Sequence, residues 1–225
     1  MRRFRLALVA VVWLPSIAAH AVNNTVVLSP ISDGAGTDQP RDGVFDHFFP
    51  SNSVYLDGSS PNAEYRSDLE FSLSSLPAGS TIVSATLQLH AVANIVFGSG
   101  GSVGVVALLR AGDGVADIGD LTGGGVAMGP VNVNQGTFPE VDFTYTAALQ
   151  ALVATGEQYA EFTLESNGSE YVLEFGARTH PIVNDRPTLT LVYTVPEPSA
   201  WILLLVGALP VGRRAVRAGY ASGKI

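Results

Sequence analysis

The sequence predicts an all-β fold: an antiparallel β-sandwich with jelly-roll-like or Greek-key-like connections, one short helix, and an apolar helix at each end of the chain. Two observations favour the sandwich. Short segments alternate apolar and polar residues with the period of two that half-buried strands require. Clusters of glycine, asparagine, aspartate and proline, such as SDGAGTDQPRDG and GDLTGGG, separate these segments. The chain has 225 residues and 47% hydrophobic content, enough to bury one sizeable core.

The two clearest strands lie in EYRSDLEFSLSSLPAGS, residues 64–80, and STIVSATLQLHAVA, residues 80–93. A turn at Pro77 to Gly79 separates them, so we expect the two strands to pair antiparallel. Alternation assigns Leu69, Phe71, Leu73, Val83, Ala85, Leu87, Leu89 and Ala91 to the core, and Asp68, Glu70, Ser72, Ser84, Thr86, Gln88 and His90 to solvent.

Three more strands are predicted in the second half of the chain, at residues 140–145, 158–166 and 187–194. Their inward residues are expected to be Val141, Phe143, Tyr145, Ala160, Phe162, Leu164, Leu189, Leu191 and Tyr193. A short helix is expected in TAALQALVATG, where Leu149, Leu152 and Val153 recur at helical spacing and Gly156 ends the pattern. The glycine-rich stretch from Asn94 to Val141 is expected to be a long loop.

The N-terminal end has the pattern of an export signal. Arg2, Arg3 and Arg5 precede an apolar run from Leu6 to Trp13, and small residues follow at Ala19 and Ala21. We therefore expect a signal peptide at residues 1–21, a β-domain at 22–194 and a separate C-terminal segment at 195–225.

The body is strongly acidic. Residues 22–196 contain five arginines, no lysine and nineteen acidic residues, a formal charge of −14. Binding to a polyphosphate needs cationic contacts, so this charge excludes a nucleic-acid partner. It also excludes electrostatic adhesion of the body to anionic lipid.

The C-terminal segment combines a polar motif with a short apolar run. Val195-Pro196-Glu197-Pro198-Ser199 precedes the twelve residues of Ala200–Val211. As a helix this run is about 18 Å long, against roughly 30 Å for a hydrocarbon core. The alternative is a buried C-terminal strand or helix. The residues expected to enter the membrane are Trp201, Ile202, Leu203, Leu204, Leu205, Val206 and Leu209. The basic residues after the run are expected to hold its end on the cytoplasmic side; they are Arg213, Arg214 and Arg217.

This order of motif, apolar run and arginines resembles the PEP-CTERM sorting signal of Gram-negative bacteria over about the last 31 residues. The resemblance implies that an exosortase recognises the Pro-Glu-Pro region and removes the tail during export, after transient insertion in the inner membrane. It further implies a cell-surface or extracellular-matrix protein associated with exopolysaccharide or biofilm. The run is interrupted by Pro210, and about eleven residues follow Arg214, which departs from the usual tail of that family.

The body resembles the DNRLRE-type bacterial extracellular β-sandwich domain between about Asn24 and Thr194. The matching residues are Arg66 before a strand, the Leu73 to Pro77 turn, Thr144 ahead of the short helix, and Arg186-Pro187 before the last strand. Some domains similar to this family bind carbohydrate, so a polysaccharide-binding module is the alternative function. Phe48 and Phe49 are its candidate ligand residues, because adjacent aromatics cannot both point inward on a strand.

Cofactors and catalysis have little support in the sequence. The acidic loop GDGVADIGD holds Asp113, Asp117 and Asp120, which are candidate calcium ligands, with Asx-turns as the alternative. No other cofactor is expected. Ser102 lies in a G-x-S-x-G spacing, but a β-rich run follows it where a nucleophile elbow needs a helix. We therefore expect no enzyme.

Overall fold

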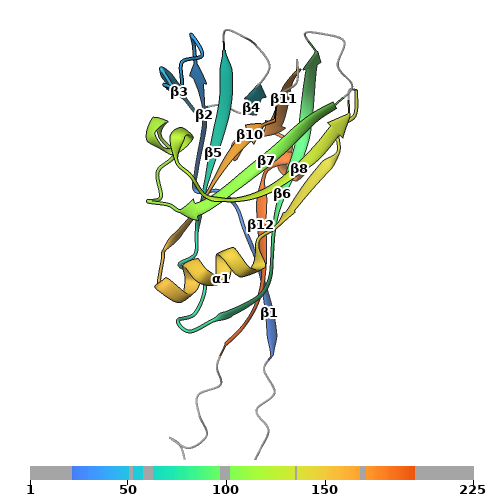
Figure 1. The fold of residues 1–225 in the computed structure, drawn as a ribbon. Helices are drawn as coiled ribbons and strands as arrows, with labels where there is room; N and C mark the ends of the chain where they lie inside the picture. Colours follow the sequence, from blue (N-terminus) through green and yellow to red (C-terminus); the bar gives the residue numbers. More distant parts are fainter. Residues whose placement is uncertain are drawn as a thin grey trace, which may run out of the picture. The chain divides into compact units, whose positions relative to one another are not determined.

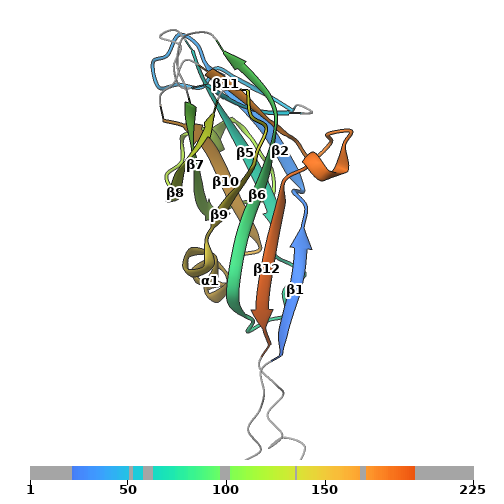
Figure 2. The ribbon, with the colours of Figure 1, turned by 90° about the vertical axis from the view of Figure 1, so that its right-hand side faces the viewer.

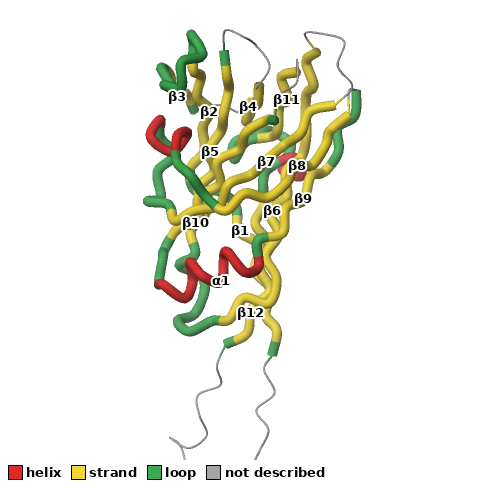
Figure 3. The backbone as a smooth tube through the Cα atoms, viewed as in Figure 1, coloured by secondary structure: helices red, strands yellow, loops and turns green. Residues whose placement is uncertain are grey.

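The computed structural model describes residues 22–50, 53–57, 63–96, 102–134, 136–167 and 171–195, all within one compact unit, Val22–Pro196. The described chain is mostly antiparallel β-sheet with one α-helix, which confirms the all-β prediction (Figure 3). The strands are β1 (Asn23–Leu28), β2 (Ser32–Asp38), β3 (His47–Phe49), β4 (Ser53–Asp57), β5 (Glu64–Ser72), β6 (Thr81–Val96), β7 (Ser102–Ala111), β8 (Val126–Asn134), β9 (Glu140–Thr144), β10 (Tyr159–Ser166), β11 (Tyr171–Gly176) and β12 (Thr188–Thr194). The helices are α1 (Thr146–Thr155) and the 3-10 turns η1 (Ile118–Thr122) and η2 (Val183–Asp185).

Two sheets form the fold. The first contains β1, β12, the beginning of β6, and β9. The second runs β8-β7-β10-β5, with β2 and β4 also paired to β5, and continues through β11 to the end of β6. The long strand β6 therefore belongs to both sheets, as Figures 1 and 2 show along its length.

The core lies between the inward faces of the two sheets. It includes the inward residues predicted for residues 68–73 and for the last three strands, except that Tyr193 is partly buried and packs against the core. Phe162 is central: Phe71 meets it edge-on at 5.6 Å between ring centroids, and Tyr145 at 5.1 Å. The Tyr145 hydroxyl is buried and donates a hydrogen bond of 2.5 Å to the Ala107 carbonyl. A satisfied hydroxyl is what allows a tyrosine to lie in an apolar core.

Helix α1 forms where the sequence predicts it. Leu149 is fully buried, and Leu152 and Val153 pack partly against the core. Gly156 ends the helix in the left-handed conformation, with φ of +84°, and the backbone N–H groups there bond back to the last turn. Glycine adopts this conformation without the clash that a Cβ would cause.

The predicted pairing of residues 64–80 with 80–93 is wrong. β5 pairs with β10, β2 and β4, whereas β6 pairs with β12, β9 and β11. The turn between them crosses from the second sheet to the first. Alternation within two neighbouring segments shows that each has a buried face, but it does not show whether they share a sheet.

The predicted inward position of Val83 is also wrong. The register between β6 and β12 shifts between Val192 and Tyr193, which face Ser84 and Ile82. This irregularity reverses the alternation, so Ile82 is buried and Val83 is 47% exposed. An extra residue in one strand moves the preceding side chains to the opposite face.

Residues 94–141 are more than a glycine-rich loop. They contain β7, η1 and β8, and β7 pairs with both β10 and β8. Glycine clusters at 112–114 and 123–125 flank the η1 turn, and the VGVVALLR segment between the glycine runs forms most of β7.

The first and last strands lie side by side, with Asn23 opposite Thr194 in the β1–β12 pair. The beginning of β1 and the end of β12 therefore lie at the same end of the sheet, as Figures 1 and 2 show. Within the described residues, the helices are too short or too polar to cross a bilayer.

Candidate functional site

Most residues predicted to direct export lie outside the described residues. These are Ala19, Ala21, Pro196, Glu197, Pro198, Ser199, the membrane residues Trp201 to Leu209, and Arg213, Arg214 and Arg217. The terminal apolar helices lie there too. Of the sorting motif the structure describes Val195, which directly follows β12.

The two candidate aromatic ligand residues are both half-buried in β3. Phe48 lies on the backbone of β2: a Cβ at Gly34 would collide with the Phe48 ring. The Phe49 ring lies 6.3 Å from that of Tyr55 in a tilted arrangement. The tip of the Phe48 ring thus packs against β2.

The three candidate calcium ligands of the GDGVADIGD loop do not converge. Asp113 and Asp117 are exposed and accept local hydrogen bonds from the backbone N–H groups of Val115 and Gly119, at 2.9 and 2.6 Å. These contacts form an Asx-turn and a cap on η1. Asp120 completes the capping box by accepting a hydrogen bond from the Asp117 N–H at 2.8 Å. Of the three candidates, Asp120 is the one with a carboxylate oxygen close to those of Asp68 and Glu161.

A cluster of acidic residues lies on the outer face of the second sheet, away from the core. Asp68 and Glu70 project from β5, and Glu161 projects from the adjacent β10. The prediction that Asp68 and Glu70 face solvent is wrong, because both are 0% exposed. With Asp120 they form what we call the acidic cluster: Asp68, Glu70, Asp120 and Glu161.

Residues 112–125, which we call the cover segment, close over the acidic cluster. The cover segment buries Leu121 completely and Ala116 almost completely. Arg66 holds it through a 2.9 Å hydrogen bond to the Leu121 carbonyl, and Thr163 donates to the Asp120 carbonyl at 3.1 Å. Contacts of this kind replace water over the outer face of β5 and β10.

Carboxylate oxygens of Asp68, Asp120 and Glu161 lie within 4.8 Å of one another. Arg110 enters the same cluster from β7. Its guanidinium forms ion pairs with Glu161 and, at 3.3 Å, with Asp120, and it donates to the Asp120 carbonyl at 2.5 Å. Arg110 therefore contacts two of the four carboxyl groups of the acidic cluster, those of Glu161 and Asp120.

Burial is the main cause of the raised pKa values in the acidic cluster. Burial, and then the Glu161 carboxyl, raise the pKa of Asp68 well above its usual range. The same two causes raise the pKa of Glu70 to about 7. Burial also raises the pKa of Glu161, although Arg110 opposes this shift. Like charges in a desolvated site favour the neutral form of each acid.

The sequence pattern did not predict the acidic cluster. Alternation distinguishes residues that face the core from residues on the outer face of a strand, but it does not show whether that outer face meets solvent or is covered by another segment. One signal was present. Acidic residues alternate with the core residues of two strands, and a glycine-rich acidic segment separates those strands in the chain. Glycine at position 112 fits this arrangement, since a Cβ there would collide with the Glu70 carboxylate.

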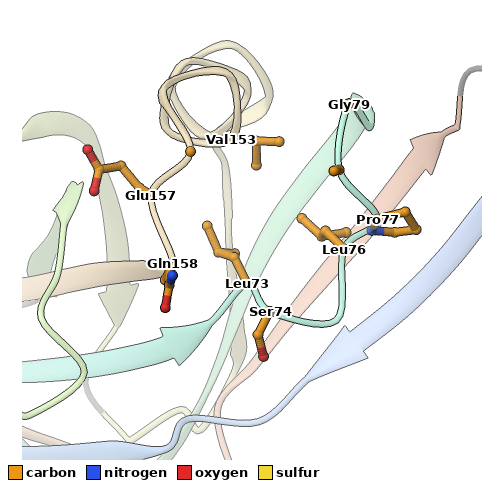
Figure 4. Close-up of a pocket in the computed structure, with 10 residues that line it drawn as sticks. Leu73, Ser74, Leu76, Pro77, Gly79, Val153, Glu157 and Gln158 are labelled. Atoms are coloured by element: carbon orange, nitrogen blue, oxygen red, sulfur yellow. The ribbon is translucent and has the colours of Figure 1, made fainter.

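A pocket of about 380 Å³ lies between the β5–β6 turn and the end of α1. Leu73, Leu76 and Val153 form its apolar side, and Glu157 and Gln158 its polar rim (Figure 4). Glu157 is the one ionisable side chain among the described residues that line it. Ser102, which the sequence does not favour as a nucleophile, is the first residue of β7 and is exposed.

Comparisons with known proteins do not identify a family. No protein-family model matches the chain, and no curated protein matches it significantly. Among solved structures, a chain of the T13 IBDV viral particle is similar at 11% identity with a TM-score of 0.25. The similarity covers 83% of this chain and 39% of the viral chain.

Proposed function

We propose that this chain is an exported, non-catalytic protein of the cell surface or extracellular matrix of a Gram-negative bacterium, sorted by an exosortase. The observation that carries the proposal is the order of Pro196-Glu197-Pro198, the apolar run Ala200–Val211 and the arginines that follow. Two prolines keep the recognition segment extended and unpaired, as a protease-like groove requires. The apolar run holds the substrate in the inner membrane while the enzyme acts.

The end of the β-domain suits this role. β12 ends at Thr194, immediately before the sorting motif, and Thr194 is held by pairing with Asn23 of β1. The beginning of β1 and the end of β12 lie at the same end of the sheet, so both segments proposed to be removed are attached at that end of the β-domain. Removal of either chain end would leave β1 and β12 paired.

Charge favours an extracellular partner over the membrane surface. The body, at −14 and without lysine, is repelled by anionic lipid and by polyphosphates. We propose exopolysaccharide as the material with which the sorted protein associates. We further propose that the body is a jelly-roll-like sandwich of the DNRLRE type, which is consistent with β6 belonging to both sheets.

The mature C-terminus tests the proposal. The full-length chain would be expressed in Gram-negative cells with and without an exosortase, and its mass measured in the membrane and extracellular fractions. We expect loss of the tail only where the exosortase is present, and retention of the intact tail in Glu197→Gln. The control is Glu157→Gln, an exposed position after α1 that should be processed like the wild type. An intact wild-type tail in exosortase-containing cells would refute the sorting proposal.

A further inference from the structure

We propose that the acidic cluster is a binding site for one Ca²⁺ ion, with Asp68, Asp120 and Glu161 as its carboxylate ligands. The site joins β5, the cover segment and β10, so the ion would fasten the cover segment to the sheet. This inference does not depend on the sorting proposal, because it concerns only described residues of the β-domain.

The geometry of the three side chains fits a calcium ion. Calcium–oxygen distances are about 2.3 to 2.6 Å, so two ligand atoms on opposite sides of the ion are roughly 5 Å apart. The three carboxylates offer oxygens within 4.8 Å of one another. Magnesium dehydrates reluctantly and usually keeps several of its waters, so a site that includes the fully buried Asp68 favours calcium. Water molecules and the second oxygens of the carboxylates can complete the six to eight ligands that calcium takes.

Asp68 supplies an observation that is independent of the clustering itself. Its side chain is fully buried, and no described N–H or hydroxyl group donates to either of its carboxylate oxygens, whose hydrogen-bonding neighbour is another acid, Glu161. An unpartnered buried carboxylate is costly, because it has lost its hydration without gaining hydrogen bonds. Its oxygens lie beside those of Asp120 and Glu161, so one cation placed among them would satisfy Asp68 directly.

The charge balance also calls for a cation. Glu161 and Asp120 share Arg110, whereas Asp68 has no ion pair among the described residues. Each carboxylate oxygen has two lone pairs, so Glu161 and Asp120 can keep Arg110 and still bind a metal ion. A divalent ion would reduce the formal charge of the four ionised carboxylates and one guanidinium from −3 to −1.

The alternative to a metal ion is a proton shared between Asp68 and Glu161. Both arrangements lower the charge of the acidic cluster, and they differ in what is bound. A shared proton predicts no calcium binding, whereas the calcium site predicts saturable binding at neutral pH; both allow the metal-free domain to be more stable in mild acid. The two are therefore distinguished by direct titration with calcium.

The test uses the full-length chain in detergent, treated with EDTA and then titrated with Ca²⁺ at neutral pH by isothermal calorimetry. We expect one Ca²⁺ per chain and a higher Tm with Ca²⁺ than with the same concentration of Mg²⁺. Asp68→Asn, which keeps the shape of the side chain, should weaken binding by at least about tenfold, because losing a charged ligand costs more than losing a residue that supports one.

Asp113→Asn is the matched control. It removes an exposed carboxylate of the same loop whose described hydrogen bond is to the Val115 N–H, so the calcium affinity should equal that of the wild type. Glu161→Gln provides a second test if Asp68→Asn does not fold, as judged by circular dichroism. Absence of saturable calcium binding to the wild type would overturn the proposal. Unchanged affinity in a folded Asp68→Asn or Glu161→Gln variant would also overturn it.

Discussion

Glu70 and Glu161 occupy directly opposed positions on the antiparallel strands β5 and β10, and both side chains are buried. Like charges at such positions are destabilising. Their outer face would normally be solvated, but the cover segment closes it. Glu70 accepts a hydrogen bond of 3.2 Å from the Asp113 N–H of that segment. The pair therefore ties the stability of the cover segment to the protonation of a buried acid.

This relationship predicts that the metal-free domain is more stable in mild acid. The pKa of Glu70 rises from 4.5 to about 7 through burial and then the Glu161 carboxyl. Between these values the folded chain holds a proton that the unfolded chain has released, so its contribution to stability is lost as the pH rises through about 7. In EDTA, the urea midpoint should be higher at about pH 5 than at about pH 8.

Glu70→Gln tests the origin of this pH dependence, because glutamine keeps the shape and cannot ionise. The difference between the two urea midpoints should shrink in this variant. Asp142→Asn, at an exposed position of β9, is the control and should keep the wild-type difference. A wild type that loses stability on mild acidification would contradict the prediction. The groups that face Glu70 and act in the same direction are Glu161 of β10, Asp68 of β5 and Asp120 of the cover segment.

Alternation of apolar and polar residues predicted much of the core but little of the outer layer. Phe143, Phe162 and Leu189 were assigned correctly, because a residue pattern of period two directly reflects which face meets the opposite sheet. Asp68 was assigned to solvent because the segment that covers it begins more than forty residues later. Only tertiary structure brings that segment onto β5.

The pairing and register of the strands could not be predicted from the sequence either. The Leu73 to Ser80 turn has ordinary hairpin composition, yet it joins strands of different sheets. The exposure of Val83 depends on an irregularity opposite Val192 and Tyr193, in a strand about a hundred residues away. Such features arise from how the two sheets fit together, and the local pattern does not encode them.

Tyr145→Phe should lower the free energy of unfolding by about 1 to 2 kcal/mol, since the variant loses a buried hydrogen bond to the Ala107 carbonyl. The ring contact with Phe162 should remain, so the fold is kept. Urea denaturation measures the change. Tyr193→Phe, at a half-buried position in β12, is the control and should have a smaller effect. An equal loss in the two variants would show that the hydroxyl of Tyr145 has no special role.

Phe48→Ala should lower the free energy of unfolding by about 2 kcal/mol, less than the cost of removing a fully buried phenylalanine. The physical reason is its packing on Gly34 of β2. Urea denaturation and retention on immobilised exopolysaccharide would be measured together. Unchanged stability with lost retention would instead assign Phe48 to ligand binding and favour the carbohydrate-binding module.

Gly156→Ala should lower the free energy of unfolding by about 1 kcal/mol, because alanine is strained in the left-handed conformation that ends α1. No atom lies within 4 Å of a Cβ built at Gly156, so the cost is purely conformational. Gly124→Ala is the matched control: it also has open space around the added Cβ, and its φ lies outside the left-handed region. Urea midpoints of the two variants separate backbone strain from crowding. A loss of equal size in both would show that the left-handed cap does not stabilise α1.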